Sequence, residues 1–289
     1  MSVLLSFGHG YSARALAPRL LARGWTVIGT TRSEEKAEAL RAEGVEPLLW
    51  GAPVEAALAR ATHVLVSAGP DADGDPVIGR YGDALRAGLG HVAWTGYLST
   101  TGVYGDHGGA WVDEETPLAP STRRGRWRVE AEAAWRALCT EAGVPLHVFR
   151  LAGIYGPGRG PFAKVRAGTA RRIVKPGQVF SRIHVEDIAG VLEASIARGG
   201  AGGVYNVCDD DPAPPEDVIA HAADLLGVPR PPEIAFAEAD MTPMARSFYA
   251  ESKRVRNARM KDDLGVRLRY PDYRAGLAAL LQAERIRGE

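Results

Sequence analysis

A glycine-rich segment near the N-terminus stands between an apolar run and a helical stretch, and it reads G-x-G-x-x-A. Glycine at position 8 permits a tight turn, and the missing Cβ at Gly10 leaves backbone N–H groups open to a phosphate. A small residue at Ala13 lets the helix pack on the strand, while the amino end of that helix adds partial positive charge. This setting predicts a dinucleotide-binding loop, with a purely structural turn as the alternative. The loop residues are Gly8, His9, Gly10, Tyr11, Ser12 and Ala13.

The next strand predicts which dinucleotide binds. An NAD-binding chain usually carries a carboxylate about 20 residues after the loop, to hold the adenosine ribose 2′-hydroxyl. The run here is Thr30-Thr31-Arg32-Ser33, which has no carboxylate, and Arg32 offers a planar pair of donors to a 2′-phosphate. We therefore expect NADP as the cofactor, with NAD as the alternative. Thr31 and Arg32 are expected to lie at the 2′-phosphate of NADP. The alternative for Arg32 is a solvated position at the start of the next helix. Ser67, at the end of a later strand, is expected to face the cofactor or to serve only as a turn residue.

The elements that would position these residues alternate along the first two thirds of the chain. Short apolar runs suit strands buried on both faces, and the stretches between them suit helices. Strands that alternate with helices imply right-handed crossovers, so we predict an α/β fold with a Rossmann-like doubly wound parallel sheet. The expected strands are Val3–Phe7, Thr26–Thr30, Val45–Trp50, His63–Ser67, His91–Leu98 and Leu146–Leu151. The expected helices are Ser12–Ala22, Glu34–Ala42, Pro53–Ala59, Val77–Ala87 and Arg126–Glu141.

After about residue 157 the elements shorten, and glycine and proline become frequent. We expect residues 1–157 to form the Rossmann domain, with 179–207 returning to it. Most of 158–289 is expected to form a small C-terminal substrate lobe over the carboxyl edge of the sheet. Within it, Asp209–Pro215 is expected to be a loop that leads into a helix at Glu216–Leu226.

The last part of the lobe is expected to hold two helices and a strand. Ser252 has the chemistry of a helix cap, and Gly265 that of a helix end. Val266–Tyr270 is expected to form a strand, because its residues are followed by a proline that would stop it. The terminal helix is expected near Tyr273–Ala283.

Composition narrows the class of protein. The 289 residues are 46% hydrophobic and 24% charged, and the 35 basic residues balance the 35 acidic ones. This is ordinary globular composition, and it gives no support for nucleic-acid binding, which usually needs a basic face. Cys139 and Cys208 have neither metal-ligand nor disulfide spacing, so we expect no metal. No apolar run is long enough for a signal peptide or a transmembrane helix, so we expect a soluble cytoplasmic protein without a membrane partner, and the sequence allows a homodimer.

Four segments in the middle of the chain carry a family resemblance. They read LSTTGVYG at 98–105, RLAGIYGPGR at 150–159, SRIHVEDIA at 181–189 and VYNV at 204–207. With the glycine loop, they resemble the extended short-chain dehydrogenase/reductase superfamily and, within it, the NAD(P)-dependent epimerase/dehydratase family. The resemblance implies a Rossmann sheet with a small C-terminal substrate lobe, in agreement with the pattern of elements.

The resemblance also implies roles for single residues. Thr100 stands four residues before Tyr104, where the family has a Ser or Thr that orients a substrate oxygen; a strand-end hydrogen bond is the alternative. The family's catalytic Tyr-x-x-x-Lys pair is replaced here by Arg124 and Arg128, in a register supported by Gly125 and other neighbours. An arginine pKa exceeds about 12, so Arg124 cannot act as a base near neutral pH. Arg128 could still donate hydrogen bonds to nicotinamide ribose hydroxyls.

The run after Thr100 departs from the family as well, since Thr101 and Gly102 stand where family dehydratases have an Asp-Glu pair. Together these departures resemble the atypical branch of the superfamily, which keeps the cofactor fold but loses the usual catalytic residues. Tyr104 and Tyr155 are then the candidates with suitable chemistry to move a proton.

Basic residues further along the chain are candidates for substrate contact. Arg159 and Arg182 are expected to bind the substrate, with a surface ion pair as an equal alternative for Arg182. Lys253 and Arg254 could hold a substrate phosphate, but a solvated basic face is the simpler explanation of both. His184 and Asp187 are expected to be structural, the carboxylate as a helix cap or in a pair.

Two functions remain open from the sequence. The first is an NADP-linked oxidoreductase or epimerase acting on a small molecule such as a nucleotide sugar, which Thr100 and the 150–159 segment favour. The second is a cofactor-binding sensor or regulatory protein without this chemistry, which the missing Tyr and Lys favour.

Overall fold

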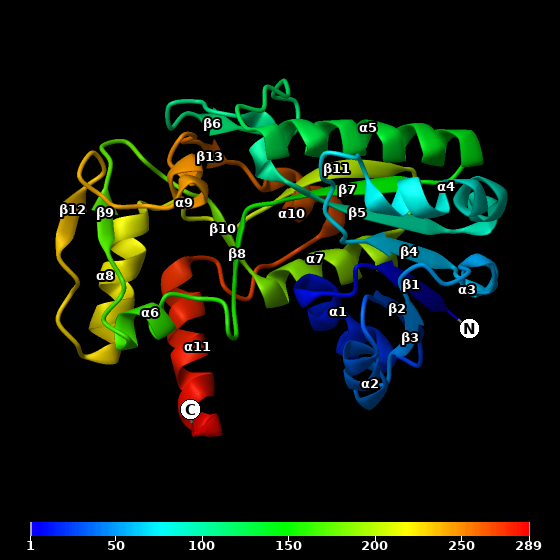
Figure 1. Cartoon of the computed structure of the whole chain (residues 1–289), viewed down its shortest axis with the longest axis horizontal. Helices are drawn as coiled ribbons and strands as arrows, with labels where there is room; N and C mark the ends of the chain where they lie inside the picture. Colours follow the sequence, from blue (N-terminus) through cyan, green and yellow to red (C-terminus); the bar gives the residue numbers. More distant parts are fainter. Residues whose placement is uncertain (1, 289) are drawn as a thin grey trace.

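The computed structural model, which describes residues 2–288, has a sheet of seven parallel strands at its centre (Figure 1). The strands lie in the order β11-β7-β5-β4-β1-β2-β3. This arrangement confirms the predicted Rossmann-like doubly wound sheet, because the order reverses at β1, between β4 and β2. The strands are β1 (Val3–Phe7), β2 (Thr26–Thr31), β3 (Glu46–Leu49), β4 (His63–Val66), β5 (Trp94–Thr100), β7 (Leu146–Leu151) and β11 (Gly202–Val207).

Helices cover both faces of the sheet because neighbouring residues of each strand point to opposite sides. Leu4 packs in the cluster that includes residues of α1, α2 and α7, whereas Leu5 packs in the cluster that includes residues of α3, α4 and α5. Figure 1 shows the first set below the sheet and α4 and α5 above it. The helices are α1 (Tyr11–Leu21), α2 (Glu34–Ala42), α3 (Glu55–Arg60), α4 (Pro76–Gly88), α5 (Arg123–Ala142) and α7 (Val185–Arg198).

The lobe has an apolar cluster of its own, in which α6, α8 and α11 pack together. Its short strands β9 and β12 pair in parallel, and two further parallel pairs, β8 with β10 and β6 with β13, connect it to the rest of the chain. The strands are β6 (Trp111–Val112), β8 (Gly153–Tyr155), β9 (Arg172–Val174), β10 (Arg182–His184), β12 (Glu233–Ala235) and β13 (Arg254–Val255). The helices are α6 (Phe162–Arg166), α8 (Pro215–Leu226), α9 (Pro243–Phe248), α10 (Ala258–Leu264) and α11 (Tyr273–Arg287), and the short 3-10 helices are η1 (Leu89–His91) and η2 (Thr101–Tyr104).

Two expected element boundaries are wrong in ways that matter for the site. The fifth strand ends at Thr100 and not at Leu98. Helix α5 begins at Arg123 and not at Arg126, because the hydroxyl of Thr122 accepts a hydrogen bond from the N–H of Gly125 at 3.1 Å and caps the helix earlier. Arg124 therefore lies in the first turn of the helix.

The strand expected at Val266–Tyr270 does not form. Two of its amides, those of Arg269 and Tyr270, donate to the buried carboxylate of Asp187 at 2.7 and 3.1 Å, so a side chain takes the place of a neighbouring strand. Ser252 does not cap α10; its hydroxyl accepts from the N–H of Val179. Gly265 does end α10, with a left-handed φ of 68°. Within residues 2–288, none of the helices combines the length and apolarity needed to cross a membrane.

Candidate functional site

A cavity of about 1800 Å³ lies at the carboxyl edge of the sheet and extends into the lobe. The glycine loop after β1, Ser67 after β4 and Thr100 at the end of β5 all line it. Because the strand order reverses between β1 and β4, this edge is where open α/β sheets place their ligands. The lobe contributes residues of α6, β9, α8, α9 and α11 to the opposite wall.

Gly8 and Gly10 of the loop are glycines for different structural reasons. Gly8 has a φ of 74°, and a Cβ there would stand 2.7 Å from the backbone nitrogen of Ala68, so the fold itself needs glycine. Gly10 has a φ of −106°, and a Cβ there would meet no protein atom closer than the Gly8 carbonyl oxygen at 3.7 Å. The protein's own packing therefore does not demand glycine at position 10, but close approach of a ligand would.

The first turn of α1 also suits an anion. Gly10 caps this helix without any side-chain hydrogen bond, and the first turn carries no acidic residue. Tyr11 and Ser12, the first two residues of the helix, line the cavity. The residues present thus fit the pyrophosphate of a dinucleotide.

His9 and Ala13 of the predicted loop set do not line the cavity. His9 is buried against β2, where a Cβ on Gly29 would lie 2.7 Å from its ring. Burial lowers the pKa of His9 to about 4, so the imidazole is neutral at pH 7. Ala13 is fully buried between α1 and the sheet, as its role in helix packing requires.

Arg32 follows the end of β2 and is exposed, outside the cavity lining. Among the described residues it has no hydrogen bond or ion pair, and Thr31 is the last residue of the strand before it. Ser33, and not Arg32, caps α2, since its hydroxyl accepts from the N–H of Lys36. The guanidinium is therefore free at the edge of the sheet.

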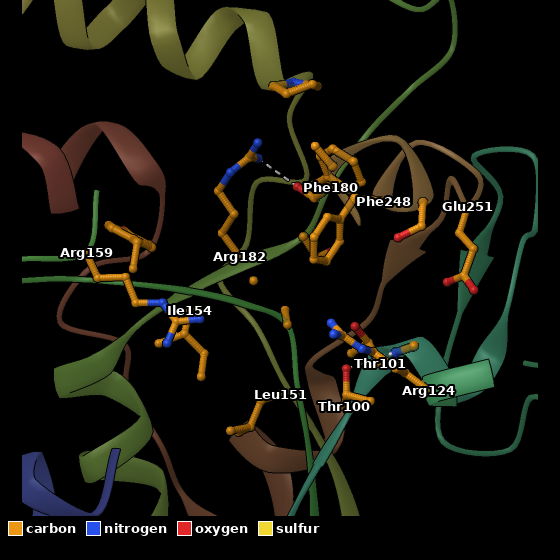
Figure 2. Close-up of a pocket in the computed structure, with 18 of the residues that line it drawn as sticks. Thr100, Thr101, Arg124, Leu151, Ile154, Arg159, Phe180, Arg182, Phe248 and Glu251 are labelled. Atoms are coloured by element: carbon orange, nitrogen blue, oxygen red, sulfur yellow. Dashed lines mark hydrogen bonds between the residues drawn. The ribbon is translucent and has the colours of Figure 1, made fainter. Parts of the chain in front are cut away.

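Thr100 and Arg124 lie at the same end of the cavity (Figure 2). The first turn of α5 packs directly on η2, and a Cβ on Gly125 would stand 2.9 Å from the carbonyl oxygen of Gly102. This close approach brings Arg124 next to the segment that begins with Thr100. The Thr100 hydroxyl accepts from the N–H of Gly102 at 3.2 Å, and Arg124 has no ion pair within the described part of the chain.

Arg128 also lines the cavity, but it is anchored to β5. Its guanidinium donates to the hydroxyl of Tyr97 at 3.0 Å and to the carbonyl of Leu98 at 2.9 Å, and it lies 5.6 Å from the centre of the Tyr97 ring. These contacts hold Arg128 in the wall beside Arg124.

Neither candidate tyrosine presents a free phenol beside Thr100. Tyr104 is fully buried outside the cavity lining, and its hydroxyl donates to Asn206 at 2.7 Å while it accepts from Arg150 at 3.0 Å. Tyr155 lines the cavity, but its hydroxyl donates to the carbonyl of Asp272. Burial raises the pKa of both phenols, which keeps them protonated.

A buried ion pair beneath the cavity escaped the sequence reasoning. Arg150 of β7 and Glu132 of α5 meet at 2.9 Å with their side chains only 5% and 4% exposed. Ser99, which lines the cavity, donates its hydroxyl to the same carboxylate, and the hydroxyl of Tyr104 accepts from Arg150. The pair therefore ties β5, α5, β7 and η2 together below Thr100. The charge of Arg150 in a mostly apolar strand could have indicated a buried ion pair, but the sequence alone does not identify Glu132 as its partner.

The arginines predicted to contact substrate both line the cavity. Arg159 is exposed, with its guanidinium 5.7 Å from the ring centre of Tyr11. Arg182 is partly buried and donates to the carbonyls of Phe180 and Ala213 at 2.8 and 2.9 Å. An ion pair with a neighbouring carboxylate, the alternative for Arg182, is not formed within residues 2–288.

Other expected roles are settled by contacts. The solvated basic face is wrong for Lys253, which is buried and bonds to Glu251 and to the carbonyl of Gly105 at 2.7 Å each. His184 caps α7 through its ring nitrogen, as a structural histidine should. In the described part of the chain, no group of three or more His, Cys, Asp or Glu residues is placed to hold a metal ion.

Fold and cavity together define an α/β protein with a large cavity at the carboxyl edge of a doubly wound sheet. Residues 90–208 match the model of the NAD dependent epimerase/dehydratase family. The chain is similar to this family over that stretch.

Three relatives illustrate the similarity. The chain is 61% identical to a conserved protein of unknown function from Silicibacter pomeroyi DSS, with a TM-score of 0.93 and coverage of 98% of this chain and 99% of that one. It is 29% identical to Protein YeeZ of Escherichia coli (strain K12) over 92% of this chain and 95% of the relative. Human epimerase family protein SDR39U1, solved with NADPH, shares the fold at 19% identity, with a TM-score of 0.76 over 97% and 99% of the two chains.

Proposed function

We propose that the protein is an NADP(H)-dependent oxidoreductase that binds a small polar substrate between Thr100 and Arg124 and works without a tyrosine base. The observation that carries the proposal is the shared cavity. The open phosphate loop, the end of β5 and the unpaired guanidinium of Arg124 all face it. A cofactor and a substrate could therefore lie in contact there.

Several residues suit the dinucleotide. Backbone groups of Gly8, Gly10, Tyr11 and Ser12 would hold the pyrophosphate, because Gly10 leaves them accessible. Arg32, unpaired and exposed, would bind the 2′-phosphate that distinguishes NADP from NAD. When bound, the nicotinamide ring would supply or accept the hydride.

Thr100 and Arg124 would act on the substrate oxygen. Both can donate hydrogen bonds, and a guanidinium stabilises negative charge that develops on a carbonyl oxygen as it is reduced. Arg124 stays protonated, so it cannot return a proton, and the proton would come from water in the open cavity. Ordinary epimerase chemistry, which needs a base that accepts and returns a proton, is disfavoured by this arrangement.

The second function, a cofactor-binding sensor or regulator, is supported by the two tyrosines. Both hydroxyls are held in protein hydrogen bonds, so neither replaces the missing catalytic phenol. Such a protein would bind the dinucleotide and respond to it without turnover.

The deciding experiment has two stages. Calorimetric titration with NADPH and NADH measures cofactor binding, and a screen of NADPH oxidation with carbonyl compounds, nucleotide sugars included, measures turnover. For any active substrate, Arg124→Ala should lower kcat/KM by about 10²-fold. Arg126→Ala is the matched control, because Arg126 is exposed in the same helix turn and does not line the cavity. NADPH binding without turnover on any compound would favour the sensor.

A further inference from the structure

The lobe end of the cavity contains a positive charge without a negative partner. Arg182 forms no ion pair with any carboxylate in residues 2–288. Asp211, one of the acidic groups near it, is paired with Arg274 at 2.5 Å. The other, Asp209, is buried and forms no ion pair with Arg182 within residues 2–288, and burial raises the pKa of its carboxyl. Within the described part of the chain, no carboxylate therefore lies at ion-pair distance from the Arg182 guanidinium.

The donors of Arg182 are divided between the protein and the cavity. One terminal nitrogen donates to the carbonyls of both Phe180 and Ala213. The Nε atom and the second terminal nitrogen form the other edge of the guanidinium, and neither is among the buried atoms that lack a partner. That edge has the geometry that binds the two oxygens of a carboxylate side by side.

Apolar side chains form much of the cavity wall near this edge. Figure 2 shows Phe180 and Phe248 close to the Arg182 side chain. Phe248 is 60% exposed, which is unusual for a large apolar side chain and indicates surface that a ligand would cover. Ile173, Val218, Ile219 and Leu277 add further apolar surface to the cavity lining. Apolar walls favour a flat hydrocarbon body over a sugar, whose hydroxyl groups would lose their hydrogen bonds to water.

We propose that the lobe end of the cavity binds an aromatic carboxylate, with the carboxylate on the free edge of Arg182 and the ring between Phe180, Phe248 and Ile219. This inference rests on the proposed function and narrows its substrate to an organic acid. The free edge of the Arg182 guanidinium matches the two oxygens of a carboxylate.

The test compares three probes on the full-length protein by calorimetry at pH 7: trans-cinnamate, the uncharged trans-cinnamamide, and uridine monophosphate. We expect cinnamate to bind at least about tenfold more tightly than cinnamamide, because the amide cannot replace the charged pair. In Arg182→Met the two should bind equally weakly. Arg198→Met, which changes an exposed arginine outside the cavity, should leave the preference intact.

A second variant keeps the test decisive if Arg182→Met fails to fold. Phe248→Ser alters an exposed side chain, and it should weaken cinnamate and cinnamamide by the same factor, about fivefold. The proposal is overturned if cinnamate does not bind, if charge makes no difference, or if uridine monophosphate binds more tightly and depends on Arg182.

The NADPH titration separates this inference from the proposed function. NADPH binding without a preference for cinnamate contradicts only the carboxylate site. A cinnamate preference that depends on Arg182, in a protein that does not bind NADPH, contradicts only the proposed function.

Discussion

Two arginines are shielded from solvent in different parts of the molecule. Arg150 lies beneath the edge of the sheet, and Arg182 lies in the lobe. Arg150 forms an ion pair with Glu132 and donates a hydrogen bond to the hydroxyl of Tyr104, so its charge is neutralised by a residue of the same chain. Arg182 meets only two carbonyls. The comparison suggests a structural role for Arg150, whose charge is paired, and a ligand-binding role for Arg182, whose charge is not. Substitution of each arginine in turn tests this distinction.

The largest expected effect is on stability at Arg150. Arg150→Met would leave Glu132 buried and unpaired, which we expect to lower the free energy of unfolding by about 3–5 kcal/mol. Arg182→Met should cost no more than about 2 kcal/mol, because it removes only hydrogen bonds to carbonyls. Urea unfolding of the two variants measures both. As a control, Arg150→Met combined with Glu132→Leu should recover most of the loss, and equal losses in the two single variants would erase the distinction.

Gly8 and Gly10 of the phosphate loop show the same contrast between a structural role and a ligand-binding role, here in the backbone. Gly8→Ala should destabilise the protein by about 2 kcal/mol or more, since φ is 74° and Ala68 stands in the way. Gly10→Ala should leave stability unchanged or raise it by less than about 1 kcal/mol, yet weaken NADPH binding about tenfold. Thermal unfolding measures the stability of the two variants, and calorimetry measures their binding of NADPH. If Gly10→Ala binds NADPH normally, the loop does not hold a pyrophosphate as proposed.

Asp209 makes the lobe's charge balance depend on pH. Its folded-state pKa of about 8 lies above the ordinary aspartate value, so the folded state binds the extra proton and stability falls as pH rises through 8. Between pH 6.5 and 8 the Asp209 carboxyl alone should lower the stability of the wild type by about 1.5 kcal/mol relative to Asp209→Asn. The buried histidines have folded-state pKa values near 4 and lose protons only from the unfolded state in this range, so they stabilise both proteins equally as pH rises and cancel in the comparison. Urea unfolding of both proteins at several pH values measures the difference, and identical pH dependence in the two would contradict the prediction.

The smallest effect is expected at an arginine that is unpaired and also exposed. Arg32→Ala should weaken NADPH binding about fivefold and leave NADH binding unchanged, because an exposed contact to phosphate is partly screened by water and salt. Calorimetric titration at low salt is the appropriate measurement. Retention of full NADP selectivity by the variant would falsify the assignment of Arg32.

The sheet could be predicted because its signals are local. Each buried strand is a short apolar run, and the glycine loop has fixed spacing between a strand and a helix, so both appear in consecutive residues. The pairing of Arg150 with Glu132 could not be predicted, since it joins β7 to α5 and depends on how they pack. The strand expected at Val266–Tyr270 failed for the same reason. Its local pattern was suitable, but a carboxylate more than 80 residues earlier took two of its amides.

The contact of Asp187 with the backbone of Arg269 and Tyr270 also has a consequence for how the chain folds during synthesis. Asp187 lies in the first turn of α7, the helix that packs beside α1 on the sheet. Until the ribosome has released residues 269 and 270, that carboxylate has no backbone amides to receive it, and its burial is costly. We therefore expect closure of this face of the sheet to be delayed until the lobe has almost entirely emerged. A nascent chain stalled before residue 265 would keep α7 loosely attached and accessible to proteases, although every strand of the sheet had already been made.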